Sequence, residues 1–464
     1  MPDSFTSAIA VNRFGLGARP GELAAAGGDP RAWLAAQLRG AAPLLSGSEL
    51  RSCEQILGNA LSLRREIREA KRSGADPTKV VTEKLPQFLR PIYVSEVTAR
   101  LSQAVLSERP FLERLTQFWT NHFAVSIDKQ FLAGLAGSFE REAIRPHVLG
   151  NFTDLLLAVE THPAMLLYLD NHLSVGPHSQ LALRAQAFQA KRKIGINENL
   201  AREILELHTL GVGGGYTQTD VTTFAEVITG WSIGADGGRI ARGPPGRFVF
   251  RDELHEPGSK RVLGRQYADH GFDQGVAVLR DVAQQRATAR FIATKLARHF
   301  VADDPPAPLV ERLSEVFVHS GGDLPSVYRA LIEANESWQQ PLAKYKTPSD
   351  YVVSSYRGLS VPVEENRGLL LPFELLGQRT WQPGSPAGWP DRSADWDGAS
   401  ALIKRIQWAD ALGGRLGSAR DAAQLAPQLL GANLSSATRS AVAHAASAAQ
   451  AVTLLMAAPE FMRR

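Results

Sequence analysis

Apolar residues recur at helical spacing through nearly every long segment of this 464-residue chain. That spacing gives a helix one apolar face, which must be buried against another element. Several segments also begin with recognisable caps, such as Asp29 before Pro30 and Thr347 before Pro348 and Asp350. A cap oxygen binds a free backbone N–H, and proline at the first helical position loses a donor that had no partner. The sequence therefore predicts an all-α fold, a globular array of many helices.

The periodic segments also predict where the helices lie. We expect helices at 48–73, 91–107, 110–123, 132–143, 152–160, 198–210, 218–228, 287–300, 309–319, 324–338, 348–359 and 399–412. One stretch departs from this pattern: Arg247–Arg251 and Arg261–Tyr267 alternate or carry β-branched residues around Pro257 and Gly258. This predicts one short β-hairpin near residues 247–267.

The domain organisation follows from length and from the absence of a clear linker. A chain of 464 residues can bury one large core or two ordinary ones. We expect a single helical unit over residues 1–464. The alternative is a subdivision into an N-terminal helical part, 1–235, and a C-terminal part, 236–464, that holds the hairpin and further helices.

Composition excludes several classes of protein. With 44% hydrophobic and 21% charged side chains, the chain is globular. Its net charge is only +4, with no dense basic run, so nucleic acid is not expected as a partner. The single cysteine, Cys53, permits no internal disulfide and is expected to be a small buried residue. No run approaches the ~20 apolar residues of a membrane span and no leader is evident, which predicts a soluble, cytoplasmic protein.

The segment 197–210 carries the densest set of polar groups: Asn197, Glu198, Asn199, Arg202, Glu203, Glu206 and His208. On a helix, Leu200, Ile204 and Leu207 would form the apolar face and the charged residues the opposite one. A solvated face is one reading, supported by the i,i+4 spacing of Glu198 and Arg202. A functional site is the other.

Established catalytic templates do not match. Gly230–Gly234 spells G-x-S-x-G, but a helix precedes it and a loop follows, whereas a nucleophile elbow needs a strand before the serine. None of the eleven histidines has a glutamate three residues before it, which argues against a di-metal helical site. An oxygen-rich site for a divalent cation, drawn from Asp170, Asn171, Glu198 and Glu203, stays open.

Other candidates lie outside the polar helix. His122 ends a strongly aromatic segment, and a packed core histidine is weighed against a functional one. His255 lies in a polar loop, where function is more common. Lys344, Lys346 and Arg357 would form either a solvated basic turn or an anion-binding edge.

The chain resembles a bacterial family known as domain of unknown function 1800. The resemblance covers nearly the whole chain and is carried by segments in the same order: NRFGLG at 12–17, FWTNHF at 118–123, PAMLLYLDN at 163–171, NENLAREILELHTLGVGGGYT at 197–217, TGW at 229–231, HEPGSKRVLG at 255–264, GWP at 388–390 and PEFMRR at 459–464. The family's activity is not established, so the resemblance implies no reaction.

The resemblance nevertheless has implications. The polar face of 198–208 looks like the family's signature helix, which favours a site there, although a buried structural network would look the same. Similar proteins tend to carry His-Pro where this chain has Gln285 and Arg286. Members of the family often look exported. Their genes often lie beside those of a second family, number 1501, that looks like phosphatases and sulfatases.

Two functions from different classes follow. The first is an enzyme or small-ligand binder whose pocket lies between the polar helix, the Asp170 turn and the His255 loop. Its catalytic residues would be Glu203, Glu206, Arg202 and His255, and its ligand-binding residues Asn197, Glu198, Asn199, Asp170, Asn171, His122 and Trp231. The second is an accessory protein that binds a family 1501 partner through an aromatic loop, 381–396, with Trp389 as an anchor.

Overall fold

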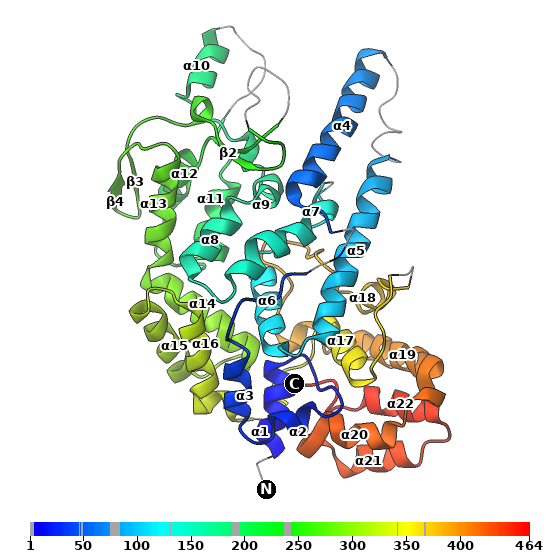
Figure 1. The fold of residues 1–464 in the computed structure, drawn as a ribbon. Coiled ribbons are helices and arrows are strands. Elements are labelled where there is room, and N and C mark those ends of the chain that lie inside the picture. The colour runs from blue at the N-terminus through cyan, green and yellow to red at the C-terminus, as the bar shows by residue number, and fades with distance from the viewer. Residues whose placement is uncertain are drawn as a thin grey trace.

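Helices dominate the structure, as the apolar periodicity predicts (Figure 1). The computed structural model describes residues 4–45, 47, 50–74, 84–129, 131–187, 195–235, 243–340, 342–365 and 368–464. The helices of the first half are α1 (Ser4–Ile9), α2 (Glu22–Ala26), α3 (Pro30–Ala36), α4 (Cys53–Arg72), α5 (Leu85–Leu106), α6 (Pro110–His122), α7 (Leu132–Phe139), α8 (Phe152–Glu160), α9 (Pro163–Tyr168), α10 (Gln180–Ala187), α11 (Asn199–Glu203) and α12 (Gln218–Val227). Those of the second half are α13 (Phe272–Ala283), α14 (Arg286–Phe300), α15 (Ala307–His319), α16 (Leu324–Glu333), α17 (Pro348–Gly358), α18 (Leu371–Leu376), α19 (Ala399–Leu416), α20 (Ala422–Leu430), α21 (Ser436–Ala443) and α22 (Ala448–Ala457).

The predicted caps begin their helices. The Asp29 side chain accepts from a backbone N–H at 3.0 Å at the start of α3. Thr347 and Asp350 form a reciprocal capping box at the start of α17. The predicted start of the helix at 48–73 lies partly outside the described residues, and α4 begins at Cys53 with Ser52 as its cap. Local cap chemistry thus places helix starts well.

Two predicted helices change character along their length. The helix predicted at 132–143 is α7 followed by a π-helical turn, Glu140–Ile144. The polar helix predicted at 198–210 is α11 followed by a π-helical turn, Ile204–His208. A π-helical turn inserts one residue and rotates the faces that follow it. His208 is buried, and Leu207, expected on the apolar face, is only half-buried.

The β structure confirms a short hairpin but differs in its pairing. β3 (Lys260–Val262) and β4 (Arg265–Tyr267) form an antiparallel hairpin, with Val262 opposite Arg265. β2 (Phe248–Phe250) pairs instead with β1 (Trp231–Ile233), so the expected partnership across Pro257 and Gly258 is wrong. The chain reverses within the second predicted strand, where Leu263 and Gly264 both have positive φ. Turn geometry, rather than β-branched composition, decides the register here.

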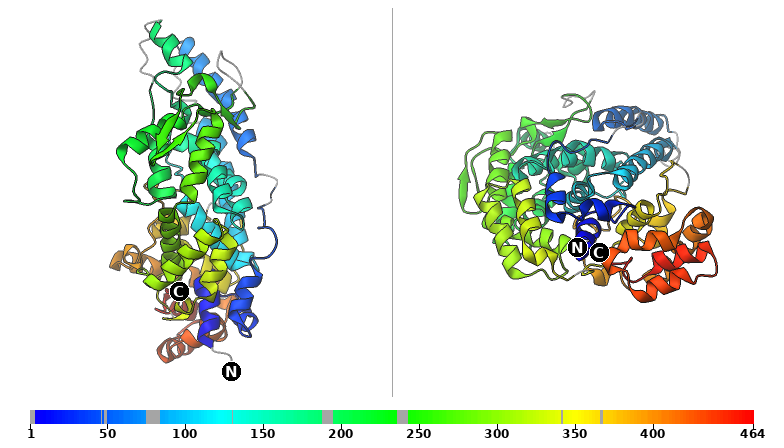
Figure 2. Two further views of the ribbon diagram at one scale, coloured as in Figure 1. Left: turned by 90° about the vertical axis from the view of Figure 1, so that its left-hand side faces the viewer. Right: turned by 60° about the horizontal axis from the view of Figure 1, so that its bottom comes forward.

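Helix α6 runs through the middle of the molecule, with most of its residues buried (Figures 1 and 2). α14 packs along α15 on one side, and α19 packs along α22 on the other. The chain ends meet, because Arg464 donates to the backbone carbonyl of Arg13 at 3.4 Å. Whether the chain forms one unit or the two parts 1–235 and 236–464 stays a prediction.

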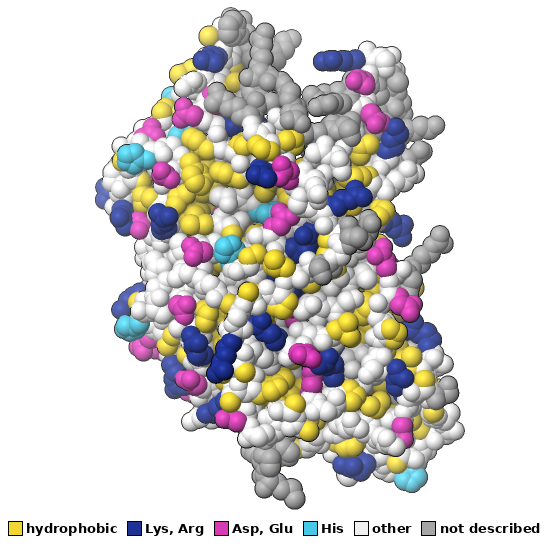
Figure 3. All heavy atoms as spheres, in the orientation of Figure 1, with side chains coloured by type: hydrophobic (Ala, Val, Ile, Leu, Met, Phe, Trp, Pro, Cys, Tyr) yellow, Lys and Arg dark blue, Asp and Glu magenta, His cyan; other side chains and the backbone are white. Residues whose placement is uncertain are grey.

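The expectations for cysteine and for surface charge can be examined directly. Cys53 is buried, as predicted, and burial raises the pKa of its thiol. Among the described residues that Figure 3 draws, Lys and Arg are interspersed with Asp and Glu, and no part of that face is covered by basic side chains alone. In the described part of the chain, no helix has the length and apolar character needed to cross a membrane.

Candidate functional site

The first turn of the predicted polar helix forms a network at the surface. Glu198 lies 3.1 Å from Arg202, at the i,i+4 spacing seen in the sequence. The Glu198 carboxylate also accepts from Gln218 and Thr222 of α12, at 2.9 and 2.7 Å. The bond from Thr222 is the main cause of the lowered pKa of Glu198. Glu198 and Arg202 thus connect α11 to α12.

The remaining polar groups of this segment are two asparagines at the start of the helix and two carboxylates farther along it. Asn197 Oδ1 accepts from the backbone N–H of Asn199 at 2.9 Å, and the Asn199 side chain is exposed. Glu203 and Glu206 are half-buried. Burial raises the pKa of Glu203 and the nearby Glu206 adds to this shift, against the opposing charge of His208. A carboxyl with a raised pKa is a candidate for proton transfer.

The other predicted residues lie in different surroundings. Asp170 pairs with Lys129 at 2.6 Å. Asn171 is buried and donates to the backbone carbonyl of Trp231 at 3.2 Å, while the Trp231 ring packs in the core. His255 is buried, and its Nδ1 lies 3.1 Å from the backbone carbonyl oxygen of Thr229. In the described part of the chain, no hydrogen bond or ion pair joins these residues to Glu203 or Glu206.

A buried histidine pair lies beside the π-helical turn. His208 Nδ1 is 2.8 Å from Glu160 Oε1, and both side chains are buried. His122 Nε2 lies 3.1 Å from the backbone carbonyl of His208, and burial lowers the pKa of His122 well below its ordinary value. Each ring keeps one nitrogen without a partner among the described residues.

A divalent cation finds no ligand set in this region. Among the described residues, no three His, Cys, Asp or Glu side chains are grouped to hold a metal ion. Of the four oxygen ligands considered from the sequence, Asp170 is paired with Lys129 and Glu198 with Arg202. These engagements explain why the carboxylates do not converge.

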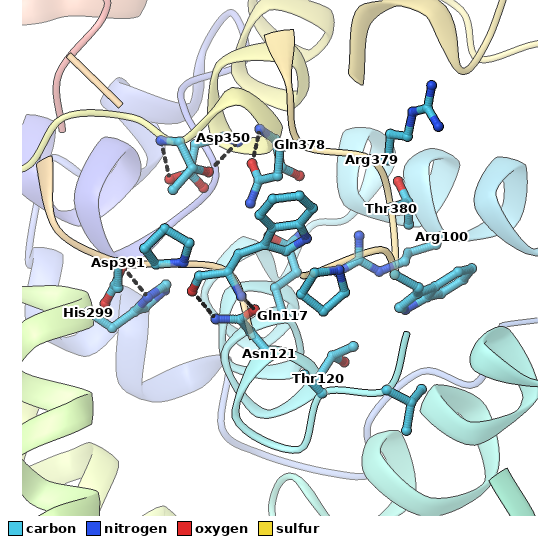
Figure 4. Close-up of a pocket in the computed structure, with 18 residues that line it drawn as sticks. Arg100, Gln117, Thr120, Asn121, His299, Asp350, Gln378, Arg379, Thr380 and Asp391 are labelled. Atoms are coloured by element: carbon cyan, nitrogen blue, oxygen red, sulfur yellow. Dashed lines mark hydrogen bonds and ion pairs between the residues drawn. The ribbon is translucent and has the colours of Figure 1, made fainter. Parts of the chain in front are cut away.

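A separate cavity lies between α5, α6, α14, the start of α17 and the loop 378–391 (Figure 4). About 90 Å³ of it is open to the centres of water molecules. We call it the Trp389 cavity. None of the catalytic or ligand-binding residues predicted from the sequence lines it, but Trp381 and Trp389 of the predicted aromatic loop do. Its wall is formed by Arg100, Gln117, Thr120, Asn121, Ala124, Val125, His299, Thr347, Ser349, Asp350, Gln378, Arg379, Thr380, Trp381, Pro383, Trp389, Pro390 and Asp391.

His299 and Asp391 form one end of this cavity (Figure 4). His299 Nδ1 lies 3.2 Å from Asp391 Oδ1, while His299 Nε2 is inaccessible to bulk water and has no partner among the described residues. Burial lowers the pKa of His299, and Asp391 opposes the shift. Burial would raise the pKa of Asp391, but His299, Lys344 and Arg464 together lower it to about 2. The pair is therefore a neutral imidazole held by an ionised carboxylate at neutral pH.

Asp350 lies on a neighbouring wall, in front of buried cations. Its two oxygens lie 3.0 Å from Arg114 Nη1 and 3.1 Å from Arg464 Nε. These arginines hold the pKa of Asp350 well below its usual range although burial would raise it. A buried carboxylate with two buried guanidinium partners is strongly held in place.

The loop 378–391 is fastened to α6 by paired hydrogen bonds. Asn121 accepts from the backbone N–H of Trp389 at 2.7 Å and donates to its carbonyl at 2.9 Å. Gly388 permits this approach, because it has φ +82° and an added Cβ would clash with the backbone carbonyl oxygen of Asn121. Trp381 is buried beneath Arg100, whose guanidinium lies 5.6 Å from the ring centre.

Comparison with known protein families identifies the family of this chain. A family model described as "Protein of unknown function (DUF1800)" matches residues 9–463. The chain belongs to this family. No curated protein and no solved structure matches it. In this DUF1800 chain, two of the segments that carry the family resemblance line the cavity through Asn121 and Trp389. A third supplies Arg464, which pairs with the cavity residue Asp350.

Sequence reasoning missed the charged residues around the cavity of this DUF1800 chain. Lys344, Lys346 and Arg357 are all buried, so the expected solvated basic turn is wrong. Lys344 lies 2.5 Å from Asp303, and Arg357 lies 2.7 Å from Glu22. The sequence signal that could have indicated the cavity is the pair of family segments GWP and FWTNHF, which supply Trp389 and Asn121.

Proposed function

We propose that this protein is an enzyme that binds a small polar molecule in the Trp389 cavity and uses His299 there as a general base. The observation that carries the proposal is the His299–Asp391 pair in the cavity wall. Nδ1 is engaged by the carboxylate, and Nε2 has no partner among the described residues. A histidine oriented by a carboxylate in a concave site is the usual arrangement of a general base.

The protonation states support this role. Because Asp391 is ionised, it can only accept a hydrogen bond, so Nδ1 of His299 carries the proton. In the neutral imidazole, Nε2 then keeps its lone pair. Since burial lowers the pKa of His299, this neutral form prevails at pH 7. It can accept a proton from an O–H group of a bound molecule or from an attacking water.

The frame around the base favours catalysis as well. Arg114 and Arg464 hold Asp350, and Asn121 holds the backbone of Trp389. Residues fixed by buried partners lose little entropy when a ligand binds, which is what a preorganised site requires.

The polar helix is a second candidate for the chemistry. Glu203 is half-buried beside Glu206, and burial raises the pKa of Glu203. A carboxyl in such surroundings can hold a proton nearer neutral pH than an exposed one does. Glu203 and Glu206 therefore stay proposed as acid or base residues, with Arg202 beside them.

Binding of a family 1501 partner through the aromatic loop is the alternative function, and two of the three indoles of that loop are buried. Trp381 and Trp396 are only 7% and 8% exposed, and Trp389 lines the cavity. Interface hot spots depend on indoles that a partner can cover. The partner function stays a prediction, and Trp389, which is half-buried, is the indole of this loop that a partner could reach.

A metabolite extract tests the enzyme proposal even though the substrate is unidentified. Wild-type protein and the His299→Gln variant are incubated with the extract, which is then compared by mass spectrometry. We expect a compound to be consumed by the wild type and about 100- to 10,000-fold more slowly by the variant. His319→Gln is the control, because His319 is exposed on α15. Equal consumption by His299→Gln and wild type would refute the role of His299, and no consumption by any of them would refute the enzyme.

A further inference from the structure

We infer that the ligand of the Trp389 cavity is a neutral polyhydroxyl molecule of about one ring, a monosaccharide or a cyclic polyol. The inference rests on the proposed function and specifies its substrate class. The space of about 90 Å³ open to water centres holds about six to nine waters. Replacing that many waters requires a ligand of about ten non-hydrogen atoms, which is the size of a single sugar ring.

The charges in the cavity wall exclude a strongly charged ligand. Arg100 lies 2.8 Å from Glu140, and Arg379 lies 3.7 Å from Glu374. The carboxylates of Asp350 and Asp391 are likewise matched by the buried cations behind the wall. An ionic ligand would lose its hydration without gaining a free counter-charge, whereas a neutral ligand avoids that cost.

The free hydrogen-bonding positions select hydroxyl groups. The buried Trp381 Nε1 has no partner among the described residues and can only donate. Gln378 uses Oε1 to accept from Ser349 at 2.8 Å, which leaves its amide N–H groups as donors. At the other end, His299 Nε2 and the second oxygen of Asp391 can accept.

A ligand that matches these positions must accept hydrogen bonds at one end and donate hydrogen bonds at the other. Hydroxyl groups do both. An ionised carboxylate or phosphate has no hydrogen to offer His299, and an ammonium group has no lone pair for the Trp381 N–H. A buried donor or acceptor left unmatched costs about 1 to 3 kcal/mol, so the position with the wrong partner would weaken such ligands.

The rest of the wall suits the C–H face of a ring. Trp389, Pro383 and Pro390 add apolar surface beside the polar groups. Small-molecule sites commonly combine such apolar walls with a few oriented polar groups. A polyol ring presents hydroxyl groups at its edge and C–H groups on its faces, which matches this division.

Calorimetry and tryptophan fluorescence test the inference on the full wild-type chain. The neutral probes are myo-inositol, D-glucose and D-galactose. The charged analogues are D-glucuronate, D-glucose 6-phosphate and D-glucosamine, and cyclohexanol is the apolar analogue. We expect at least one neutral probe to bind with a Kd of about 2 mM or tighter, from the ligand efficiency of ~12 non-hydrogen atoms. It should bind about tenfold more tightly than its charged analogues.

A matched pair of variants locates the bound probe. Trp381→Phe removes one donor and should weaken binding about 3- to 10-fold, the value of one neutral hydrogen bond. Trp408→Phe is the control, because Trp408 is buried against Tyr351 and does not line the cavity. Unchanged affinity in Trp381→Phe would place the polyol elsewhere and overturn the inference.

The outcomes also separate this inference from the proposed function. Tighter binding of a charged or apolar analogue would overturn the polyol class and leave a functional cavity. If none of the probes binds but the extract experiment shows turnover that depends on His299, the polyol class is overturned and the proposed enzyme function stands. If no compound binds and none is consumed, both proposals fail.

Discussion

Replacing the buried Lys346 should stabilise the protein, and the gain should depend on pH. Lys346 is only 2% exposed. Its amine donates to Ser354 at 3.0 Å and lies 4.0 Å from the centre of the Phe461 ring. Burial lowers its pKa to about 7; Asp350 opposes the shift, and three nearby arginines add to it. The folded state is therefore penalised whenever this amine must carry a proton.

The sign of the pH dependence follows from proton binding. Between pH 7 and the ordinary lysine pKa of 10.5, the unfolded chain binds a proton that folded Lys346 does not. Stability contributed by this group therefore rises with pH over that range. The penalty on the folded state is about 5 kcal/mol at pH 6 and about 2 kcal/mol at pH 9. Lys346→Met removes it but also loses a hydrogen bond of about 1 kcal/mol.

We therefore expect Lys346→Met to be about 3 to 4 kcal/mol more stable than wild type at pH 6 and about 1 kcal/mol more stable at pH 9. Urea denaturation at both pH values measures the difference, and other titrating groups cancel in the comparison. Lys344→Met is the control, because Lys344 is equally buried but pairs with Asp303 and Asp391. Its loss should destabilise by about 2 to 4 kcal/mol. A gain for Lys346→Met that is the same at pH 6 and pH 9 would refute the reasoning.

Three further substitutions test the cavity wall and the polar helix. Asp350→Asn leaves two buried arginines without their carboxylate, so it should lower the free energy of unfolding by about 3 to 5 kcal/mol in urea denaturation. The control is Glu311→Gln, which breaks an exposed ion pair and should lower it by less than about 1 kcal/mol. Gly388→Ala, at φ +82° and against the α6 backbone, should cost about 2 to 4 kcal/mol and reduce the fluorescence response to any cavity ligand. Glu203→Gln should leave the melting temperature at pH 7 unchanged or higher, because the raised pKa of Glu203 means that its ionised form is disfavoured in the folded state. A clear fall in its melting temperature would instead identify a structural network.

The fold could be predicted from local signals because helices are specified locally. Apolar spacing and caps such as Asp29 and Thr347 act within one or two turns, and the structure has helices at these places. The π-helical turn at Ile204–His208 could not be predicted, since no residue in it signals an inserted position.

The cavity could not be predicted because its partners are remote in sequence. Arg114 and Asp350 are 236 residues apart, and Asn121 and Trp389 are 268 residues apart. Contacts of this kind have no local spacing, unlike the i,i+4 ion pair of Glu198 and Arg202, which the sequence predicts and the structure contains. The burial of Lys344 and Lys346 could not be predicted either, because a charged residue in an isolated sequence is expected to be solvated.

Helix α6 connects the polar segment 197–210, which the sequence predicts as a site, with the Trp389 cavity, which it does not predict. On one side of α6, Asn121 fastens the cavity loop, and the Phe118 ring lies 5.4 Å from that of His299. At its C-terminal end, His122 contacts the backbone of His208, which is itself held by Glu160. Both histidine–carboxylate pairs therefore act on the same buried helix, and His299 lines the Trp389 cavity. The His208 pair fixes the end of α6, and α6 in turn holds the wall on which His299 and Trp389 depend.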